Sequence, residues 1–145
     1  MNYKLRWSFF WALAAIFILV VLFLFIPAVR NIVSTKPVLL ALGISLLVLG
    51  GAIIYLTIKE KLTGLQMVFM LLTGASASGI TVCVLLHNVI YGLFIYWFGP
   101  GFWNGIGLPD EPVFFFLGLV FFPIALLVGI TGSIVLALRN QRKHD

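Results

Sequence analysis

Charge is scarce in this sequence: Lys, Arg, Asp and Glu together make up 9% of its 145 residues, while hydrophobic residues make up 63%. A soluble domain is typically about 25% charged and about 45–50% apolar. Because too few charged side chains remain to cover a water-facing surface, the composition excludes an ordinary soluble domain. The sequence predicts an all-α integral membrane protein, and its length fits a single domain over residues 1–145.

Reactive side chains are equally scarce. The chain has one cysteine, Cys83, and two histidines, His87 and His144. A lone cysteine excludes an internal disulfide and a CxxC redox pair. Cys83 and His87 alone also fall short of the three or four protein ligands that zinc sites use. No Ser-His-Asp set or phosphate-binding glycine loop is present, so we expect no catalytic residues, no metal and no enzymatic activity.

The apolar residues form runs that are long enough to cross a bilayer. A hydrocarbon core of about 30 Å corresponds to about 20 helical residues. We expect four transmembrane helices in a single bundle, over residues 7–26, 38–58, 68–98 and 113–138. The third run is too long for one perpendicular span, so either the helix is strongly tilted, or its first turns protrude from the membrane or break near Gly74. Pro123 should kink the fourth helix.

The basic residues lie at the ends of these runs and not in one patch. One side of the membrane receives only Arg30 and Lys36, whereas the other receives Lys4, Arg6, Lys59, Lys61, Arg139, Arg142 and Lys143. Because Lys and Arg are enriched in cytoplasmic loops, this pattern predicts a multi-pass protein of the cell (cytoplasmic) membrane with both termini cytoplasmic. It favours contact with lipid headgroups over a nucleic-acid partner.

Small residues spaced by four mark the expected helix contacts, because helices in lipid associate through close packing. They are Gly74 with Ser78 and Ala75 with Gly79 in the third run, and Ala125, Gly129 and Ser133 in the fourth. We expect the third and fourth helices to pack tightly and the second helix to close the core. The first helix, apolar all round, should be the most exposed to lipid.

The third run also has a polar face. At about 100° per residue, one half of this helix carries Thr81, Cys83, His87, Asn88 and Tyr91. Ionisable residues within a membrane are hypotheses for functional sites. His87 could shuttle a proton or act as an axial ligand to haem or chlorophyll. The simpler alternative is a neutral imidazole that is hydrogen-bonded to a neighbouring helix, with Asn88 in a similar role.

The segment between the third and fourth runs is rich in glycine and proline. Asp110 and Glu111 directly precede Pro112, an arrangement typical of the start of a helix, so we expect both acids to act as helix caps. Paired carboxylates for acid–base chemistry are the alternative. Phe102 and Trp103 should pack this segment onto the end of the bundle.

Within residues 73–133, the segments TGASASGITVCVLLHNVIYGLF and GLPDEPVFFFLGLV resemble a group of uncharacterised small four-span prokaryotic membrane proteins. The resemblance implies a prokaryotic membrane and no known activity. Small multidrug exporters need a glutamate in the first span, which is missing here, and quinone-linked disulfide enzymes need cysteine pairs.

These observations lead to one expected function and two alternatives. We expect a non-enzymatic bundle in the lipid bilayer that serves as an accessory subunit of other membrane proteins or forms a homo-oligomer. The first alternative is a small transporter or channel that uses the polar face around His87. The second is a cofactor-binding membrane anchor with His87 as axial ligand, although a bis-His haem within one chain is excluded because His144 lies in the tail.

Overall fold

The structure, a computed structural model, describes residues 2–27 and 35–142. Every regular element in these two ranges is helical, which confirms the all-α class. In chain order the elements are α1 (Asn2–Phe25), α3 (Thr35–Lys59), α4 (Gly64–Phe98), α5 (Phe102–Gly105), α6 (Pro112–Phe116), the π-helical turn η1 (Leu117–Phe121) and α7 (Phe122–Gln141). The first loop, expected near Arg30, falls largely outside the described residues.

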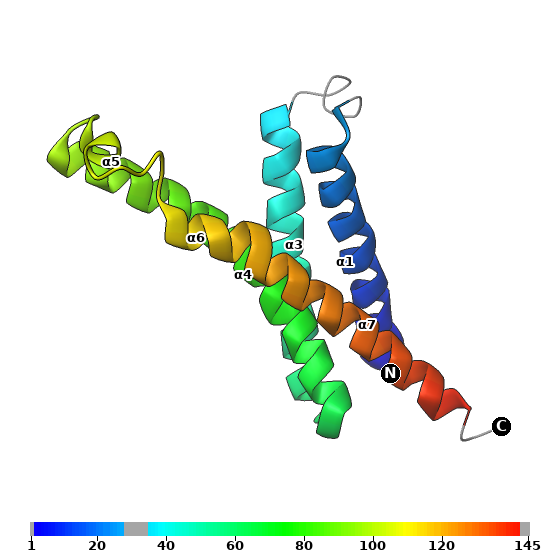
Figure 1. Cartoon of the computed structure of the whole chain (residues 1–145). Helices are drawn as coiled ribbons and strands as arrows, with labels where there is room; N and C mark the ends of the chain where they lie inside the picture. Colours follow the sequence, from blue (N-terminus) through cyan, green and yellow to red (C-terminus); the bar gives the residue numbers. More distant parts are fainter. Residues whose placement is uncertain (1, 28–34, 143–145) are drawn as a thin grey trace.

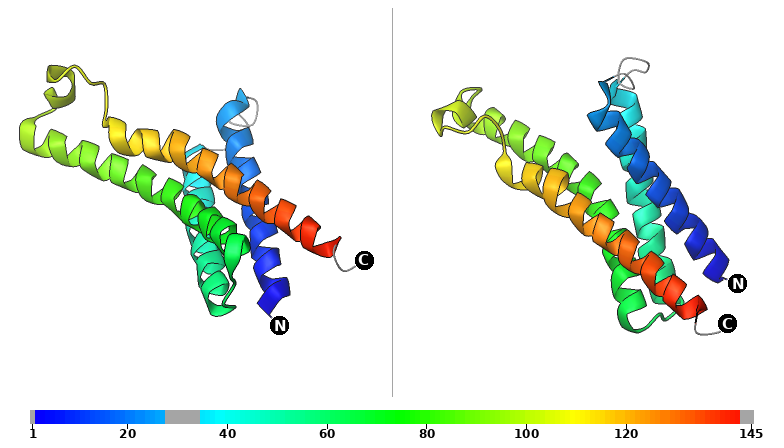
Figure 2. Two further views of the ribbon diagram at one scale, coloured as in Figure 1. Left: turned by 60° about the horizontal axis from the view of Figure 1, so that its bottom comes forward. Right: turned by 45° about the vertical axis from the view of Figure 1, so that its right-hand side comes forward.

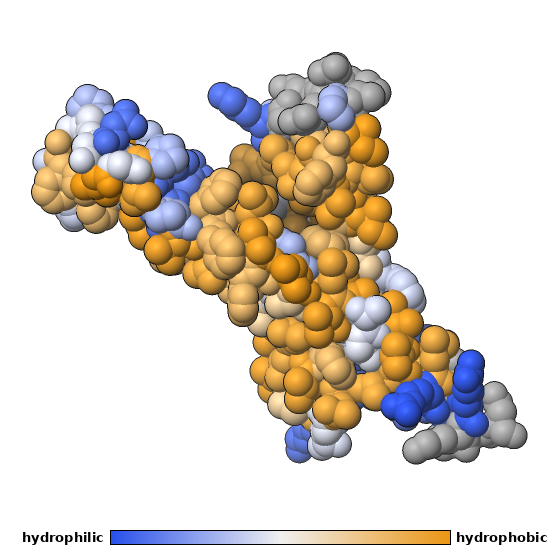
Figure 3. Space-filling view, in the orientation of Figure 1, coloured by the Kyte–Doolittle hydropathy of each residue, from blue (hydrophilic) through white to orange (hydrophobic). Residues whose placement is uncertain are grey.

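The four predicted spans are confirmed as helices by length and composition. The stretches long and apolar enough to cross a bilayer are Tyr3–Phe25, Lys36–Lys59, Gly64–Phe98 and Pro112–Asn140. The last of these combines α6, η1 and α7. Figure 3 shows that hydrophobic residues cover most of the visible surface and that hydrophilic residues concentrate at the extremities. This distribution suits a molecule whose middle is surrounded by lipid.

The helices pack in a chain of neighbours. α1 packs against α3, α3 against α4, and α4 against α7. The start of α1 and the end of α7 lie at the same end of the molecule (Figure 1). Towards the other end, α4 and α6 lean away from α1 and α3, and all three views agree on this divergence (Figure 2). The molecule therefore has two helical arms, one formed by α1 and α3 and the other by the outer part of α4 with α6. The arms come together towards the end that carries the termini.

A single hydrophobic core joins the spans. Its buried members are Phe10, Leu13 and Phe17 of α1, Leu46 and Ile53 of α3, Met70 and Ala77 of α4, and Leu126 of α7. The expectation that the first helix is the most exposed to lipid is wrong. Of its apolar stretch, 28% is buried, against 17% for that of α3. A helix that is apolar all round gives no sequence signal for the face that is buried, because no polar side marks the opposite face.

α4 is one unbroken helix of 35 residues, so the alternative of a break near Gly74 is wrong. Its length of about 52 Å, at about 1.5 Å per residue, exceeds the hydrocarbon thickness. The helix changes direction along its course (Figure 1). Within it, Thr73 Oγ1 donates to Phe69 O at 2.8 Å, and this kind of hydrogen bond to the preceding turn bends helices. The bend lets the outer half of α4 lean away from α3.

The fourth span is irregular immediately before Pro123. Proline has no backbone N–H and its ring clashes with the preceding turn. Residues Leu117–Phe121 form a π-helical turn, and Phe122 N donates to Leu117 O, five residues back. The wider turn accommodates Pro123 near the start of α7. A π-helical turn is therefore present where the sequence predicts that Pro123 disturbs the helix.

Candidate functional site

The strongest candidate site lies where α6 begins beside α4. Glu111 is the N-cap residue of α6, and its carboxylate accepts from Val113 N at 2.8 Å and Phe114 N at 2.9 Å. Pro112 follows in the first turn. Asp110 behaves differently, because its Oδ1 accepts from Glu111 N at 2.7 Å and not from the helix. Glu111 therefore caps α6, while Asp110 fixes the turn that leads into it.

His87 of α4 contacts both acidic residues. Its Nδ1 lies 3.1 Å from the backbone oxygen of Glu111 and 3.4 Å from Glu111 Oε2. Its Nε2 lies 3.3 Å from Asp110 Oδ2. The side chain of His87 is 16% exposed, that of Glu111 6% and that of Asp110 43%. The reversal of the chain between α4 and α6 therefore brings one imidazole and two carboxylates together. The sequence predicted separate roles for these residues.

The partners of the ring decide what this cluster does chemically. Both ring nitrogens of His87 face oxygen acceptors, namely a backbone carbonyl or carboxylate at Nδ1 and a carboxylate at Nε2. A neutral imidazole carries one N–H, whereas the imidazolium carries two. The cluster therefore joins α4 to the turn before α6 through polar contacts at both ring nitrogens of His87.

Aromatic side chains cover the cluster. The ring of His87 stacks on Tyr91, with centroids 6.4 Å apart and planes 19° apart, and lies 5.7 Å from Phe115. Tyr91 in turn stacks on Trp103 of α5 at 5.9 Å. Trp103 is 7% exposed, and its Nε1 donates to Tyr91 O at 3.3 Å. The α5 segment therefore packs onto the outer end of α4, as its aromatic residues predict.

The other residues of the predicted polar face point in three directions. Thr81 is buried against α3, where its Oγ1 donates to Gly43 O at 2.8 Å. Cys83 is buried beside Gly118 of η1. Asn88 is exposed, and its Nδ2 donates to Val84 O of its own helix at 2.7 Å. Within residues 2–27 and 35–142, the expected hydrogen bond from Asn88 to a neighbouring helix is therefore not present.

The small residues of α4 serve both neighbouring helices. A Cβ at Gly74 would lie 2.7 Å from Gly50 O, and Ser78 Oγ donates to Leu47 O at 3.4 Å, so this pair faces α3. A Cβ at Gly79 would lie 2.7 Å from the Phe122 ring, so that glycine faces α7. α4 thus makes close contacts on two sides with two different sets of small residues.

The small residues of the fourth span differ in their surroundings. A Cβ at Gly129 would lie 2.6 Å from Thr73 Oγ1, which marks a close approach of α7 to α4. Ser133 is fully buried and Ala125 is half-buried. Ala75, by contrast, is exposed. Its expected role in packing is therefore wrong within this chain, because the step from Ala75 to Gly79 does not follow one buried face.

A second polar cluster was missed by the sequence analysis. Arg6 of α1 forms an ion pair with Glu60, which directly follows α3, and their side chains are 1% and 13% exposed. Nearby in the sequence, Trp7 Nε1 and Thr57 Oγ1 are buried without a hydrogen-bond partner among the described residues. The sequence did contain a signal for this pair. If the first and second spans are antiparallel, the start of the first span lies beside the end of the second.

No protein-family model, curated protein or solved structure matches this chain. The resemblance of residues 73–133 to small prokaryotic membrane proteins stays a prediction. Across residues 2–27 and 35–142, no group of three or more His, Cys, Asp or Glu side chains is arranged to hold a metal ion.

Proposed function

We propose that this chain is a non-enzymatic integral membrane protein that acts by association within the bilayer, either as an accessory subunit or as a homo-oligomer. The observation that supports this proposal is the position of Asn88. Its side chain is exposed on α4 among Val84, Leu85 and Val89, which are exposed as well. Its Nδ2 bonds to its own helix, and within the described residues its carboxamide oxygen accepts no hydrogen bond.

A carboxamide in this setting favours a partner helix. Polar groups that face hydrocarbon without a hydrogen bond cost free energy, because lipid tails offer no donor or acceptor. Asn side chains in membranes bond across helices, and each such bond contributes about 0.6–2 kcal/mol. A second helix at this face of α4 would supply the missing donor. The apolar residues around Asn88 would pack against the same helix.

The test measures association directly. The protein is purified in mild detergent for mass determination by light scattering, and two labelled populations are mixed in liposomes for energy transfer. We expect a dimer or larger assembly, or a membrane protein that co-purifies in fixed ratio. Asn88→Leu should weaken the association about threefold, which corresponds to an interhelical bond of about 0.6 kcal/mol.

The matched control is Ser45→Ala. Ser45 Oγ also donates to its own helix, at Ala41 O, from a different span, so removing it should leave association unchanged. A strictly monomeric protein in both detergent and liposomes, with no stoichiometric companion, contradicts the proposal.

A transporter or channel is the second candidate, and the cluster at His87 favours it. The carboxylates of Asp110 and Glu111 lie within 3.4 Å of its ring nitrogens. Proton-coupled transport uses such groups. In proteoliposomes, His87→Ala should then change solute or proton flux or its pH dependence, while Cys83→Ser should not. Identical flux in wild type and H87A argues against this function.

The arrangement of His87 does not fit an axial ligand to haem or chlorophyll. Metal ligation needs a ring nitrogen that is free to face the metal, and Nε2 faces Asp110 Oδ2 while Nδ1 faces Glu111. An absorption spectrum of the protein purified from its native membrane tests this. Absorbance in the visible range that is lost in H87A would restore the cofactor anchor as a candidate.

A further inference from the structure

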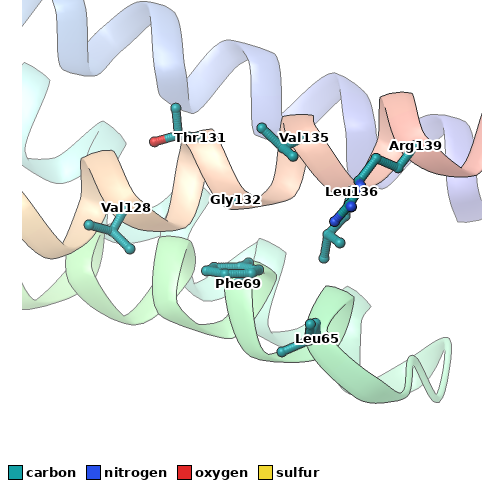
Figure 4. Close-up of a pocket in the computed structure, with 8 residues that line it drawn as sticks. All are labelled: Leu65, Phe69, Val128, Thr131, Gly132, Val135, Leu136 and Arg139. Carbon is teal, nitrogen blue, oxygen red and sulfur yellow. The ribbon is translucent and has the colours of Figure 1, made fainter.

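A groove runs between the first turns of α4 and the last turns of α7. Its volume is about 430 Å³, within the range of about 300–1,000 Å³ that is typical of small-molecule sites. Leu65 and Phe69 line it from α4, and Val128, Thr131, Gly132, Val135, Leu136 and Arg139 line it from α7 (Figure 4). The groove belongs to neither the His87 cluster nor the exposed face around Asn88.

The floor of the groove depends on a close contact. A Cβ at Gly132 would lie 2.4 Å from the ring of Phe69, so α7 comes very near this ring. Leu65, Val128 and Val135 around the floor are each about half exposed or more. From Val128 to Arg139 the groove follows α7 for about 16 Å at about 1.5 Å per residue. The result is a mostly apolar groove that is open to the surroundings.

Arg139 gives the groove a charged end. Figure 4 shows its guanidinium nitrogens extending back over Leu136 towards the groove. Among the described residues, the ion pairs involve Arg6 and His87 but not Arg139. The groove therefore combines an apolar length with one cation that no described carboxylate neutralises.

We propose that this groove binds one acyl chain of an anionic phospholipid, with the lipid phosphate held by Arg139. The apolar length matches a hydrocarbon chain, and arginine pairs with phosphate through two parallel N–H groups. Membrane leaflets that carry anionic lipids attract basic residues next to a span in the same way. The lipid would lie along α7 and seal its contact with Phe69 of α4.

A second copy of this chain is a poorer occupant of the groove. The same end of the molecule carries exposed Lys4, Lys59, Lys61 and Arg142. At this end of the molecule, the only acidic residue among the described residues is Glu60, which is paired with Arg6. Another copy would therefore bring like charges towards Arg139, whereas an anionic headgroup neutralises it.

The binding experiment compares two lipids with identical chains. The purified protein in neutral detergent is titrated with palmitoyl-oleoyl phosphatidylglycerol or phosphatidylcholine, and bound lipid is counted by native mass spectrometry. We expect one tightly held lipid per chain and an affinity about fivefold higher for the anionic lipid, as expected for one basic residue near an anionic lipid. Arg139→Gln should remove this preference. Arg142→Gln, a neighbouring exposed arginine outside the groove, should keep it.

A second pair of variants tests the apolar length. Val135→Trp fills the groove and should abolish retention of both lipids, while Leu138→Trp, exposed on the same helix but outside the groove, should not. If V135W does not retain the wild-type thermal unfolding curve, Val128→Trp carries the same test. Glycerol 3-phosphate should not displace the lipid.

Three outcomes overturn the proposal. If R139Q and R142Q lose the preference for the anionic lipid equally, the preference arises from the summed positive charge near the end of α7 and not from Arg139 in the groove. Retention of lipid by a folded groove-filling variant would place the acyl chain elsewhere. Displacement of the lipid by glycerol 3-phosphate would show that the site binds the phosphate alone and does not hold the acyl chain.

Discussion

Arg6 at the start of α1 and Glu60 just after α3 form an ion pair whose members are almost fully enclosed, with side chains 1% and 13% exposed. The pair joins the two ends that antiparallel packing of α1 and α3 brings together. Removing one partner of a buried ion pair leaves the other charge without compensation. Substitution of one of the two residues should therefore destabilise the contact between α1 and α3, which is otherwise mostly apolar.

We predict that Glu60→Gln lowers the free energy of unfolding by about 3 kcal/mol, because the Arg6 charge then lacks its counter-ion. The double variant Arg6→Met, Glu60→Met should recover most of this loss, since replacing both members of a buried pair is often neutral or stabilising. Thermal or denaturant unfolding in detergent measures both. If E60Q unfolds like the wild type, the pair does not stabilise the contact.

We predict that Gly74→Ala destabilises the α3–α4 contact by about 1–3 kcal/mol, as overpacking does. Its new Cβ would lie 2.7 Å from both Gly50 O and Ile54 Cγ1. Gly51→Ala is the matched control, because a Cβ there meets nothing within 4 Å. G51A should be neutral or gain about 0.5–1 kcal/mol from its helix propensity. Comparable losses in the two variants would show that α3 and α4 do not approach closely at Gly74.

We predict that His87→Phe loosens the segment from Gly99 to Glu111 while the rest of α4 stays ordered. Phenylalanine keeps an aromatic ring beside Tyr91 but loses the contacts of Nδ1 and Nε2 with Glu111 and Asp110. Loss of a partner that leaves a buried polar group unsatisfied costs about 1–3 kcal/mol, so amide exchange in this segment should rise about fivefold or more. Hydrogen-exchange mass spectrometry measures this. Asn88→Leu, at the adjacent exposed position, should leave the exchange unchanged, and an unaltered H87F would show that the cluster does not hold the loop.

We predict that the α5 segment and the turn after α3 face opposite sides of the membrane, with the turn in the cytoplasm. In a Cys83→Ser background, Ile106→Cys should react with a membrane-impermeant maleimide in intact cells, and Lys61→Cys only after permeabilisation. Both positions are exposed, whereas Cys83 is buried. The reverse labelling pattern would invert the proposed orientation.

The spans were predictable because the signal for them is local. An uninterrupted apolar run long enough to cross hydrocarbon must satisfy its backbone hydrogen bonds within itself, and a helix is the way a single run does so. The start of α6 was predictable for the same reason. Glu111 and Pro112 act on the adjacent turn, and the cap needs no distant residue.

Pairings between distant residues depended on tertiary packing. Glu60 lies 54 positions from Arg6, and the backbone oxygen of Glu111 that meets His87 lies 24 positions away from it. Such pairs form only when two helices adopt one particular rotation and offset. Helices that are apolar all round do not encode that choice in their periodicity, which is why the first helix was wrongly expected to be the most exposed to lipid.

Local pattern was therefore sufficient for the number, approximate limits and helical nature of the spans, since each run forms its hydrogen bonds within itself. Tertiary structure decided which polar groups meet. It buried Arg6 with Glu60, placed His87 between Asp110 and Glu111, and left Asn88 exposed. The physical reason is that a side chain's partner depends on how neighbouring helices are rotated and offset, and close packing of small residues such as Gly50, Gly74 and Gly129 sets that arrangement.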